Sequence, residues 1–386
     1  MGEPHLTSKL QGFGTTIFAE MSALAEATKS INLGQGFPDT DGPVEMADAA
    51  IAAIRGGANQ YPPGPGIRDL RGAIVEHQQR FYGCDFDPVD EVVVTTGATE
   101  AVAAALLGLV DPGDEVVALE PFYDSYAACI AMAGGRRVPV TLRAPEFRLD
   151  VDRLRAAVTG RTKLILLNTP HNPTGAVLER HELEAVAALA IERDLVVVTD
   201  EVYEHMSFET PHVPISTLPG MRDRTLTISS AGKTFSFTGW KVGWAVGPAD
   251  LVRAVLMAKQ FMTFVSGAPF QPAVAAGLRL PDEYFEALRT TLRGKRDLLC
   301  KGLREVGFEV FEPAGTYFVT VDVRPLGYDD GVAFCRDLPK RAGVVAIPHQ
   351  VFYDDPQAGR PLVRFAFCKR DEVLTEAIER LQVLRR

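Results

Sequence analysis

Lys233 lies just after a short β-branched run, Thr225–Ile228, in a stretch rich in serine and glycine. The run predicts a buried strand, so the lysine that follows it has little contact with water. Desolvation disfavours the ammonium form, and a neutral lysine amine can form a Schiff base with an aldehyde. Lys233 is therefore a candidate nucleophile, although a lone lysine before a loop is more often a surface residue.

Asp200 ends the apolar run Val196–Thr199, where a carboxylate is costly unless it faces a cation or a strong hydrogen-bond donor. One interpretation is that Asp200 begins a helix as its N-cap. The other is that it lies beside a pyridine nitrogen and keeps that nitrogen protonated, so that the ring can accept electrons from a carbanion. Tyr203 would reach the same ligand if the chain turns helical after Asp200.

Two glycine-containing segments offer backbone groups to a ligand. Gly97, Ala98 and Thr99 follow a predicted strand and open a helix, which favours phosphate binding. Their spacing matches neither GxxxxGK[ST] nor GxGxxG, so neither a nucleoside triphosphatase nor a Rossmann dinucleotide site is predicted. In Leu33–Asp39, the glycine at position 36 permits close approach of the backbone, and an ordinary turn is the alternative.

Arg364 lies within the alternating segment Leu362–Cys368, on the face opposite Val363 and Phe365. An arginine between apolar neighbours is either a surface residue with an extended side chain or a bidentate clamp for a carboxylate. The sequence alone leaves both interpretations open.

Strand and helix patterns alternate through the first two thirds of the chain. The near-continuous Val, Ile and Leu runs predict a mostly parallel sheet with helices on both faces. Ligands of such sheets lie beyond the carboxyl ends of the strands, where Ala98, Asn172, Asp200 and Lys233 all fall. We therefore expect one site. The predicted strands are 91–96, 116–119, 137–141, 163–167, 195–199, 225–228 and 241–246, and the predicted helices are 15–27, 44–55, 67–82, 100–109 and 180–192.

After about residue 275 the pattern changes to that of a compact α+β unit. A charged helix is predicted at 282–305 and another helix at 331–341. Strands are predicted at 316–323, 344–347 and 361–368, and a last amphipathic helix at 374–384.

The bulk composition excludes several classes of function. The 386 residues carry a formal net charge of −10 without a long basic run, so we expect no nucleic-acid partner. No apolar run reaches the length of a membrane span, and residues 1–14 lack the apolar core of a signal peptide. The five cysteines are scattered and form no CxxC pair, so we expect no metal site and a reducing, cytoplasmic location.

Taken together, these residues resemble the class I aminotransferases, which are pyridoxal 5'-phosphate enzymes of the aspartate-aminotransferase fold. The motifs keep the order and spacing of that family over essentially the whole chain. They are Asn172-Pro173-Thr174-Gly175, Asp200-x-x-Tyr203, Ser230-x-x-Lys233 with Lys241 eight residues later, and Arg364. The resemblance implies an α/β fold with a large cofactor-binding domain at 47–275 and a small α+β domain at 276–386, which the N-terminal segment 1–46 joins.

The resemblance also implies how the cofactor is held. Lys233 binds it as a Schiff base and then shuttles the proton of the reaction, Asp200 pairs with the pyridine nitrogen, and Tyr123 stacks on the ring. Asn172 and Tyr203 hydrogen-bond its phenolic oxygen. The phosphate is bound by Ala98, Thr99, Ser230 and Lys241. At position 241 the family usually has arginine, and lysine keeps the charge but loses the bidentate fork.

Substrate and subunit contacts follow from the same resemblance. The backbone of Gly36, together with Asn172 and Arg364, binds the α-carboxylate of the substrate. Tyr61 reaches the phosphate in the neighbouring subunit, which implies a homodimer with a shared active site.

Other segments point to a subgroup. Leu33–Asp39, Asn59–Tyr61 and Glu120–Tyr126 resemble the kynurenine and glutamine transaminases. Tyr61–Gly66, Ser266–Pro272 and Arg324–Asp330 resemble the actinobacterial N-succinyldiaminopimelate aminotransferases of lysine biosynthesis, which use 2-oxoglutarate. The alternatives are a kynurenine, glutamine or methionine aminotransferase, a cysteine S-conjugate β-lyase, a regulatory domain that binds the cofactor without turnover, and a sheet protein without a cofactor. The negative charge disfavours the regulatory domain, and the joint placement of Lys233, Asp200, Asn172 and Arg364 disfavours the last.

Overall fold

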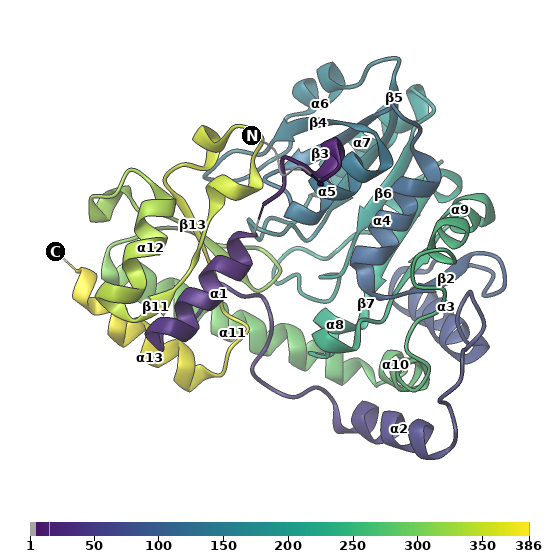
Figure 1. Ribbon diagram of the computed structural model, residues 1–386, viewed down its shortest axis with the longest axis horizontal. Helices are drawn as coiled ribbons and strands as arrows, with labels where there is room; N and C mark the ends of the chain where they lie inside the picture. The colour runs from purple at the N-terminus through teal and green to yellow at the C-terminus, as the bar shows by residue number, and fades with distance from the viewer. Residues whose placement is uncertain (1–4, 15, 386) are drawn as a thin grey trace.

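The computed structural model describes residues 5–14 and 16–385, which form three β-sheets surrounded by helices (Figure 1). The central sheet has the strand order β2-β8-β7-β6-β5-β3-β4. Its strands are β2 Val92–Thr95, β3 Glu115–Glu120, β4 Arg136–Thr141, β5 Thr162–Asn168, β6 Val196–Asp200, β7 Thr225–Ser230 and β8 Gly243–Val246. The predicted α/β class is confirmed.

The central sheet is mostly parallel, as its apolar strands predict. β4, β3, β5, β6 and β7 pair in parallel, whereas β8 runs antiparallel to both β7 and β2. Every residue of β3 and of β7 is buried, so both faces of the sheet are covered. Since β2 and β7 are both antiparallel to β8, they share one direction. The carboxyl ends of β2, β5, β6 and β7 therefore meet at the same edge.

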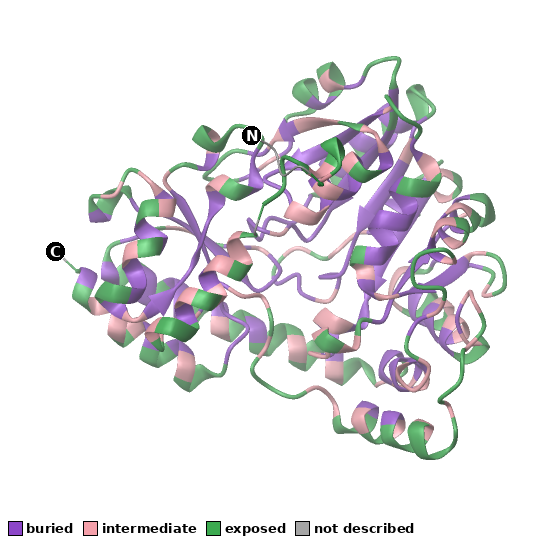
Figure 2. Cartoon of the chain, viewed as in Figure 1, coloured by how far each residue is buried: buried purple, intermediate pink, exposed green. Residues whose placement is uncertain are grey.

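Helices form separate cores on the two faces of this sheet. On one face, Val116 and Ala118 of β3 pack with α4 (Gly97–Leu109), α5 (Asp124–Ala133) and α9 (Ala249–Lys259). On the other, Val117 and Leu119 pack with α6 (Val151–Ala157) and α7 (Arg180–Glu192). This alternation along β3 is the two-residue period of a strand. Figure 2 shows the buried strands enclosed by helices whose outer faces are exposed.

A third group of helices packs at the β2 edge. α3 (Arg68–Tyr82) and α10 (Phe270–Leu278) share a core with β2 and β8, and α2 (Val44–Arg55) packs on α10. Because α10 lies between α2 and α3, little of its surface faces water and its amphipathic period is weak. The sequence pattern does not predict α10, and the same holds for α5, α6 and α9.

The C-terminal part of the chain forms a second unit with an antiparallel sheet of order β12-β13-β10-β9. Its strands are β9 Glu309–Phe311, β10 Phe318–Asp322, β12 Ile347–Pro348 and β13 Leu362–Ala366. Its core includes side chains of α1 (Ile17–Thr28), α11 (Asp282–Val306), α12 (Gly331–Ala342) and α13 (Asp371–Leu381). Within the described residues, no helix is long and apolar enough to cross a membrane.

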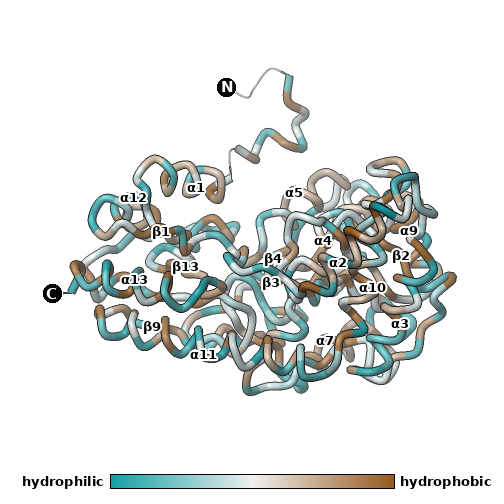
Figure 3. Tube along the Cα trace, turned by 90° about the horizontal axis from the view of Figure 1, so that it is seen from below, coloured by the Kyte–Doolittle hydropathy of each residue, from teal (hydrophilic) through white to brown (hydrophobic). Residues whose placement is uncertain are grey.

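The N-terminal segment is bound to this second unit. β1 (Ile31–Asn32) pairs in parallel with β11 (Val344–Val345), and the Leu33 carbonyl accepts a 2.6 Å hydrogen bond from the N–H of Ala366. Figure 3 shows α1, α12 and α13 together at one end of the molecule, away from α3, α9 and α10. The loop after β1 is thereby placed beside β13. The domain limits at residues 46 and 275 stay a prediction.

Several predicted boundaries differ from the structure. The strand predicted at 344–347 is split into β11 and β12, which belong to different sheets, and two further differences fall at the site. The helix predicted at 100–109 begins at Gly97, so its first turn includes the residues predicted to bind phosphate. The strand predicted at 241–246 begins at Gly243, because Lys241 has a left-handed backbone, with φ of 54°, after the 3₁₀ turn Thr238–Trp240. Lys241 is therefore set apart from the strand.

Gly243 packs so closely against the first turn of α4 that a Cβ atom there would lie 2.5 Å from the carbonyl carbon of Gly97. Gly243→Ala should destabilise the protein by about 1–3 kcal/mol, the usual cost of overpacking, and lower the midpoint of thermal unfolding followed by circular dichroism. Gly239→Ala is the matched control, because no atom lies within 4 Å of its Cβ position. Equal midpoints for the two variants would contradict the close packing.

Candidate active site

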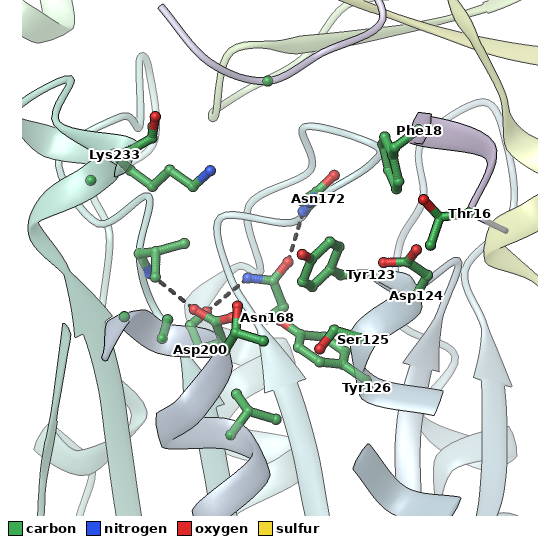
Figure 4. A pocket seen from close by; sticks show the side chains of 18 of the residues that line it. Thr16, Phe18, Tyr123, Asp124, Ser125, Tyr126, Asn168, Asn172, Asp200 and Lys233 are labelled. Carbon is green, nitrogen blue, oxygen red and sulfur yellow. Dashed lines mark hydrogen bonds between the residues drawn. The ribbon is translucent and has the colours of Figure 1, made fainter. Parts of the chain in front are cut away.

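A cavity of about 900 Å³ lies at the edge where the carboxyl ends of the central strands meet. Its walls come from the loops after β2, β5, β6 and β7, the loop after β1, and β13 of the second unit. Figure 4 shows Lys233, Asp200, Asn172 and Tyr123 around one space. Every predicted site residue except Tyr61 lines it: Gly36, Ala98, Thr99, Tyr123, Asn172, Asp200, Tyr203, Ser230, Lys233, Lys241 and Arg364.

Lys233 lies on a one-turn helix, α8 (Ala231–Thr234), which directly follows β7. Among the described residues its amine has no hydrogen-bond or ion-pair partner, and Nζ lies 5.8 Å from the centre of the Tyr203 ring. Burial lowers the pKa of Lys233 to about 8. A substantial fraction of the amine is therefore uncharged slightly above neutral pH, as a nucleophile requires.

Asp200 is buried at the end of β6, with its side chain on the cavity wall. Its Oδ2 accepts a 2.7 Å hydrogen bond from the Tyr126 hydroxyl, and its Oδ1 accepts a 3.3 Å bond from the N–H of Val202. Burial raises the pKa of Asp200 to about 6 against these bonds. Residues 202–205 form turns rather than a helix, so Asp200 is not a helix N-cap. Tyr203 still reaches the cavity from these turns.

The first turn of α4 and Lys241 together form a seat for an anion. A Cβ atom on Gly97 would lie 3.2 Å from the Lys241 Nζ, so the ammonium lies directly over this turn. The Thr96 side chain caps none of the N–H groups of α4. Lys241 has no ion-pair partner within residues 5–14 and 16–385. A helix N-terminus under a free cation is the arrangement that phosphate prefers.

Arg364 is buried on β13, with 1% of its surface exposed, which excludes the surface interpretation. Its guanidinium donates to Asn172 Oδ1 and to the Gly34 carbonyl, both at 2.8 Å, and lies 3.9 Å from the centre of the Phe318 ring. Nε has no hydrogen-bond partner, and no carboxylate of the described residues pairs with this cation. Burial lowers the pKa of Arg364 to about 10, which leaves it charged. A buried, unpaired guanidinium fits a ligand carboxylate.

The loop that carries Gly36 is fixed against β10. The Gly36 carbonyl accepts a 2.6 Å hydrogen bond from the Tyr317 hydroxyl. A Cβ atom at position 36 would lie 2.4 Å from the Phe318 ring. Glycine is therefore required for the backbone to approach the cavity here.

Some residues of the site were not predicted. Asn168 joins two predicted residues, because its Oδ1 accepts from the N–H of Asn172 and its Nδ2 donates to the Asp200 carbonyl, both at 2.8 Å. Tyr126 bonds Asp200. Asn168 could have been predicted, because it ends the strand that pairs with the strand ending in Asp200. Tyr126 could have been predicted from its position three residues after Tyr123. The structure also brings Phe13, Thr16, Phe18, Tyr317 and Phe318 to the site from distant segments.

Tyr61 lies outside the cavity and is 81% exposed. Its ring makes an edge contact with Phe264, with centroids 5.5 Å apart. Its role in a neighbouring subunit stays a prediction.

One group of described residues outside the cavity has metal-ligating side chains. Ligand atoms of His77, Glu204 and His205 lie within 4.8 Å of one another. The two imidazoles already form a 2.8 Å hydrogen bond between their Nε2 atoms. The expected absence of a metal site stays a prediction.

The cavity thus combines a partly neutral lysine, a buried carboxylate and an anion seat, with an unpaired guanidinium opposite. The lysine matches an aldehyde and the buried carboxylate matches a ring nitrogen. The anion seat matches a phosphate, and the guanidinium matches a substrate carboxylate. The residues present therefore fit pyridoxal phosphate and an amino acid.

Comparison with known proteins agrees with this fit. Residues 28–381 match the family described as aminotransferase class I and II. A relative from Mycobacterium tuberculosis named probable N-succinyldiaminopimelate aminotransferase DapC is 56% identical over 390 residues, which cover 98% of each chain. The methionine aminotransferase of Escherichia coli K12 is 42% identical over 378 residues, again 98% of each chain.

A solved structure of N-succinyldiaminopimelate aminotransferase from Mycobacterium tuberculosis has a TM-score of 0.97 to this fold. The match is 56% identical and covers 98% of this chain and 100% of that one. The chain therefore belongs to the class I and II aminotransferases, pyridoxal-phosphate-dependent enzymes that act on amino acids and 2-oxo acids.

Proposed function

We propose that this aminotransferase transfers the amino group between N-succinyl-LL-2,6-diaminopimelate and 2-oxoglutarate, a step of lysine biosynthesis. The full-length identity of 56% to the relative named probable N-succinyldiaminopimelate aminotransferase supports this substrate. The convergence of Lys233, Asp200 and Arg364 on one cavity supports the chemistry.

Pyridoxal phosphate, when bound, supplies an electron sink for the carbanion that forms at the α-carbon of the substrate. Lys233 Nζ takes the α-proton, which requires the uncharged amine that burial favours. The Asp200 carboxylate holds a proton on the ring nitrogen. Its burial strengthens this charge pairing.

Other residues orient the reacting groups. Arg364 binds the α-carboxylate with its guanidinium, and Asn172 fixes that guanidinium through a 2.8 Å hydrogen bond. The backbone of Gly36 binds the same carboxylate from the loop after β1. Holding the carboxylate fixes the direction of the α-C–H bond, which lowers the entropic part of the barrier. Tyr123 would pack on the face of the cofactor ring, and Tyr203 would hydrogen-bond the phenolic oxygen of the cofactor. Ala98, Thr99, Ser230 and Lys241, which line the cavity, would hold the phosphate.

We further propose that two copies form a homodimer in which Tyr61 reaches the phosphate of the neighbouring site. A group of exposed apolar side chains includes Tyr61, Phe261, Met262 and Phe264. Tyr61 contacts Phe264, and the other two residues lie close to Phe264 in the sequence. Exposed apolar groups of this kind mark interaction surfaces. The five cysteines are free and buried, which fits a cytoplasmic enzyme.

A second candidate is an aminotransferase for methionine or kynurenine. Phe13, Ile17, Phe18, Phe37 and Val351 line the cavity and make part of its wall apolar. This wall suits an uncharged side chain, and the Escherichia coli relative is named methionine aminotransferase. The substrate carboxylate would bind Arg364 in the same way.

Lys233→Ala should retain pyridoxal phosphate without the covalent bond and lose transamination. We expect kcat to fall by about four orders of magnitude, the upper range for removal of an acid–base group. The purified variant should also lack the pH-dependent yellow absorption band of the wild type. Lys301→Ala is the control, because this lysine is exposed on α11. Normal turnover by Lys233→Ala would refute the assignment.

Arg364→Ala should weaken binding of both substrates, because both carry the same carboxylate beside the reacting carbon. The loss of charge-assisted hydrogen bonds predicts a rise in KM of about 10- to 100-fold for the amino acid and for the 2-oxo acid. Steady-state kinetics with each substrate varied in turn measures both. Arg180→Ala, which removes an exposed arginine on α7, is the control. Unchanged KM values would count against the clamp.

The substrate is tested by comparing kcat/KM for N-succinyl-LL-2,6-diaminopimelate with the values for kynurenine, glutamine and methionine, at saturating 2-oxoglutarate. We expect the succinylated substrate to exceed the others by about 10-fold or more, which corresponds to about 1.4 kcal/mol of transition-state binding. A higher value for methionine or kynurenine would replace the first candidate by the second.

A further inference from the structure

The Tyr126 side chain contacts two residues, Asp200 and Tyr123, to which we assign cofactor binding. Its hydroxyl donates a 2.7 Å hydrogen bond to Oδ2 of Asp200. Its ring is perpendicular to that of Tyr123, with centroids 5.8 Å apart. Tyr126 lies in the first turn of α5, and Tyr123 is the residue that precedes this helix as its N-cap. Figure 4 shows Tyr126 and Asn168 next to Asp200.

The direction of this hydrogen bond matters for the charge of Asp200. Burial raises the pKa of Tyr126 well above its ordinary value, so its hydroxyl keeps its proton. A permanent donor bonds a carboxylate more strongly than a neutral carboxyl group, and it therefore favours the ionised form. The bond is buried, since 4% of Tyr126 and 6% of Asp200 are exposed.

The other groups that face Asp200 support its charge less well. Burial and the charge of Glu201 disfavour the carboxylate, and the charge of Lys233 favours it. Tyr123 and Tyr203 also face it, and burial holds their pKa values above the ordinary tyrosine value, so they are neutral. Lys233 is itself partly uncharged, and its proposed role uses the same amine. The Val202 N–H, at 3.3 Å, is the longer of the two hydrogen bonds.

We propose that Tyr126 is a positioning residue that keeps the Asp200 carboxylate ionised and directed into the cavity while the Lys233 amine takes part in the reaction. The inference deepens the proposed role of Asp200 and rests on it. Asn168 completes the arrangement, because it holds the backbone carbonyl of Asp200 at 2.8 Å.

The first test measures the titration of Asp200 in the protein without cofactor. Carbon-13 NMR of protein labelled at the aspartate carboxyl carbon follows the signal, which Asp200→Ala identifies by its disappearance. In Tyr126→Phe we expect the Asp200 titration to move upward by roughly one to two pH units, because one hydrogen bond to a charged group is lost. Tyr328→Phe is the matched control, since its hydroxyl also bonds an aspartate, Asp337, outside the cavity. An unshifted titration in Tyr126→Phe overturns the proposal.

The second test separates a charge effect from a packing effect. The dissociation constant of pyridoxal phosphate is measured for the wild type, Tyr126→Phe, Asp200→Ala and the double variant. We expect Tyr126→Phe to weaken binding by about 10-fold in the wild type and by less than about twofold when Asp200 is already absent. Equal losses in both backgrounds would show that Tyr126 acts through packing alone, and would overturn the proposal.

Failure of the proposed role of Asp200 and failure of the Tyr126 variant to fold can each be told apart from failure of this proposal. If Asp200→Ala binds pyridoxal phosphate as tightly as the wild type, the proposed role of Asp200 fails, and Tyr126 cannot act through it on the cofactor. If Tyr126→Phe does not fold, 3,5-difluorotyrosine at position 126 keeps the shape of the side chain and makes a stronger donor. The Asp200 titration should then move downward, and an unchanged titration would count against the proposal.

Discussion

The site depends on the burial of charged groups that lack a full set of partners among the residues that the structure describes. Desolvation is the largest cause of the shifted pKa of Lys233, Asp200 and Arg364, and in each case it favours the neutral form. The folded protein carries this cost without a ligand, and groups of opposite charge recover it when they bind. Ligands that bind the folded state alone stabilise it by mass action, so stability and occupancy of the site are linked.

The architecture explains how these groups come to share one cavity. The parallel strands β5, β6 and β7 deliver Asn168, Asp200 and Ser230 to one edge, and the second unit delivers Arg364 from the opposite side. The cation of Arg364 is tied to the strand edge through Asn172, at 2.8 Å. The site is therefore built between two cores, and neither core contains all of its groups.

The sequence could predict the position of those site residues that lie at or directly after the ends of strands. Asp200 and Lys233 could be predicted because each ends or follows a continuous apolar run, and parallel strands bring such ends together. Two local features of the site do not follow from the strand pattern. The left-handed backbone of Lys241 and the turns after Asp200 depend on packing that no periodic pattern reports.

Contacts between distant segments could not be predicted either, because they also depend on packing that no periodic pattern reports. Phe318 lies under the Arg364 guanidinium, and Tyr317 fixes Gly36, through pairing of β10 with β13 and of β1 with β11. Nothing near position 317 marks these roles. Tyr126 is an intermediate case: its position three residues after Tyr123 points to it, but its bond to Asp200 depends on how α5 packs against β6.

The pairing of β1 with β11 also bears on how the chain matures during synthesis. Ile31 and Asn32 are synthesised before their partners Val344 and Val345, which follow more than 300 residues later in the chain (344 − 31 = 313), and Leu33 is further bound by Ala366. On the ribosome, the central sheet can assemble while the first strand still lacks its neighbour, because domains fold as their residues emerge. The backbone at Gly36 therefore takes its place only after residues 344–366 have left the exit tunnel. An incomplete polypeptide cannot present a finished cavity to an amino acid.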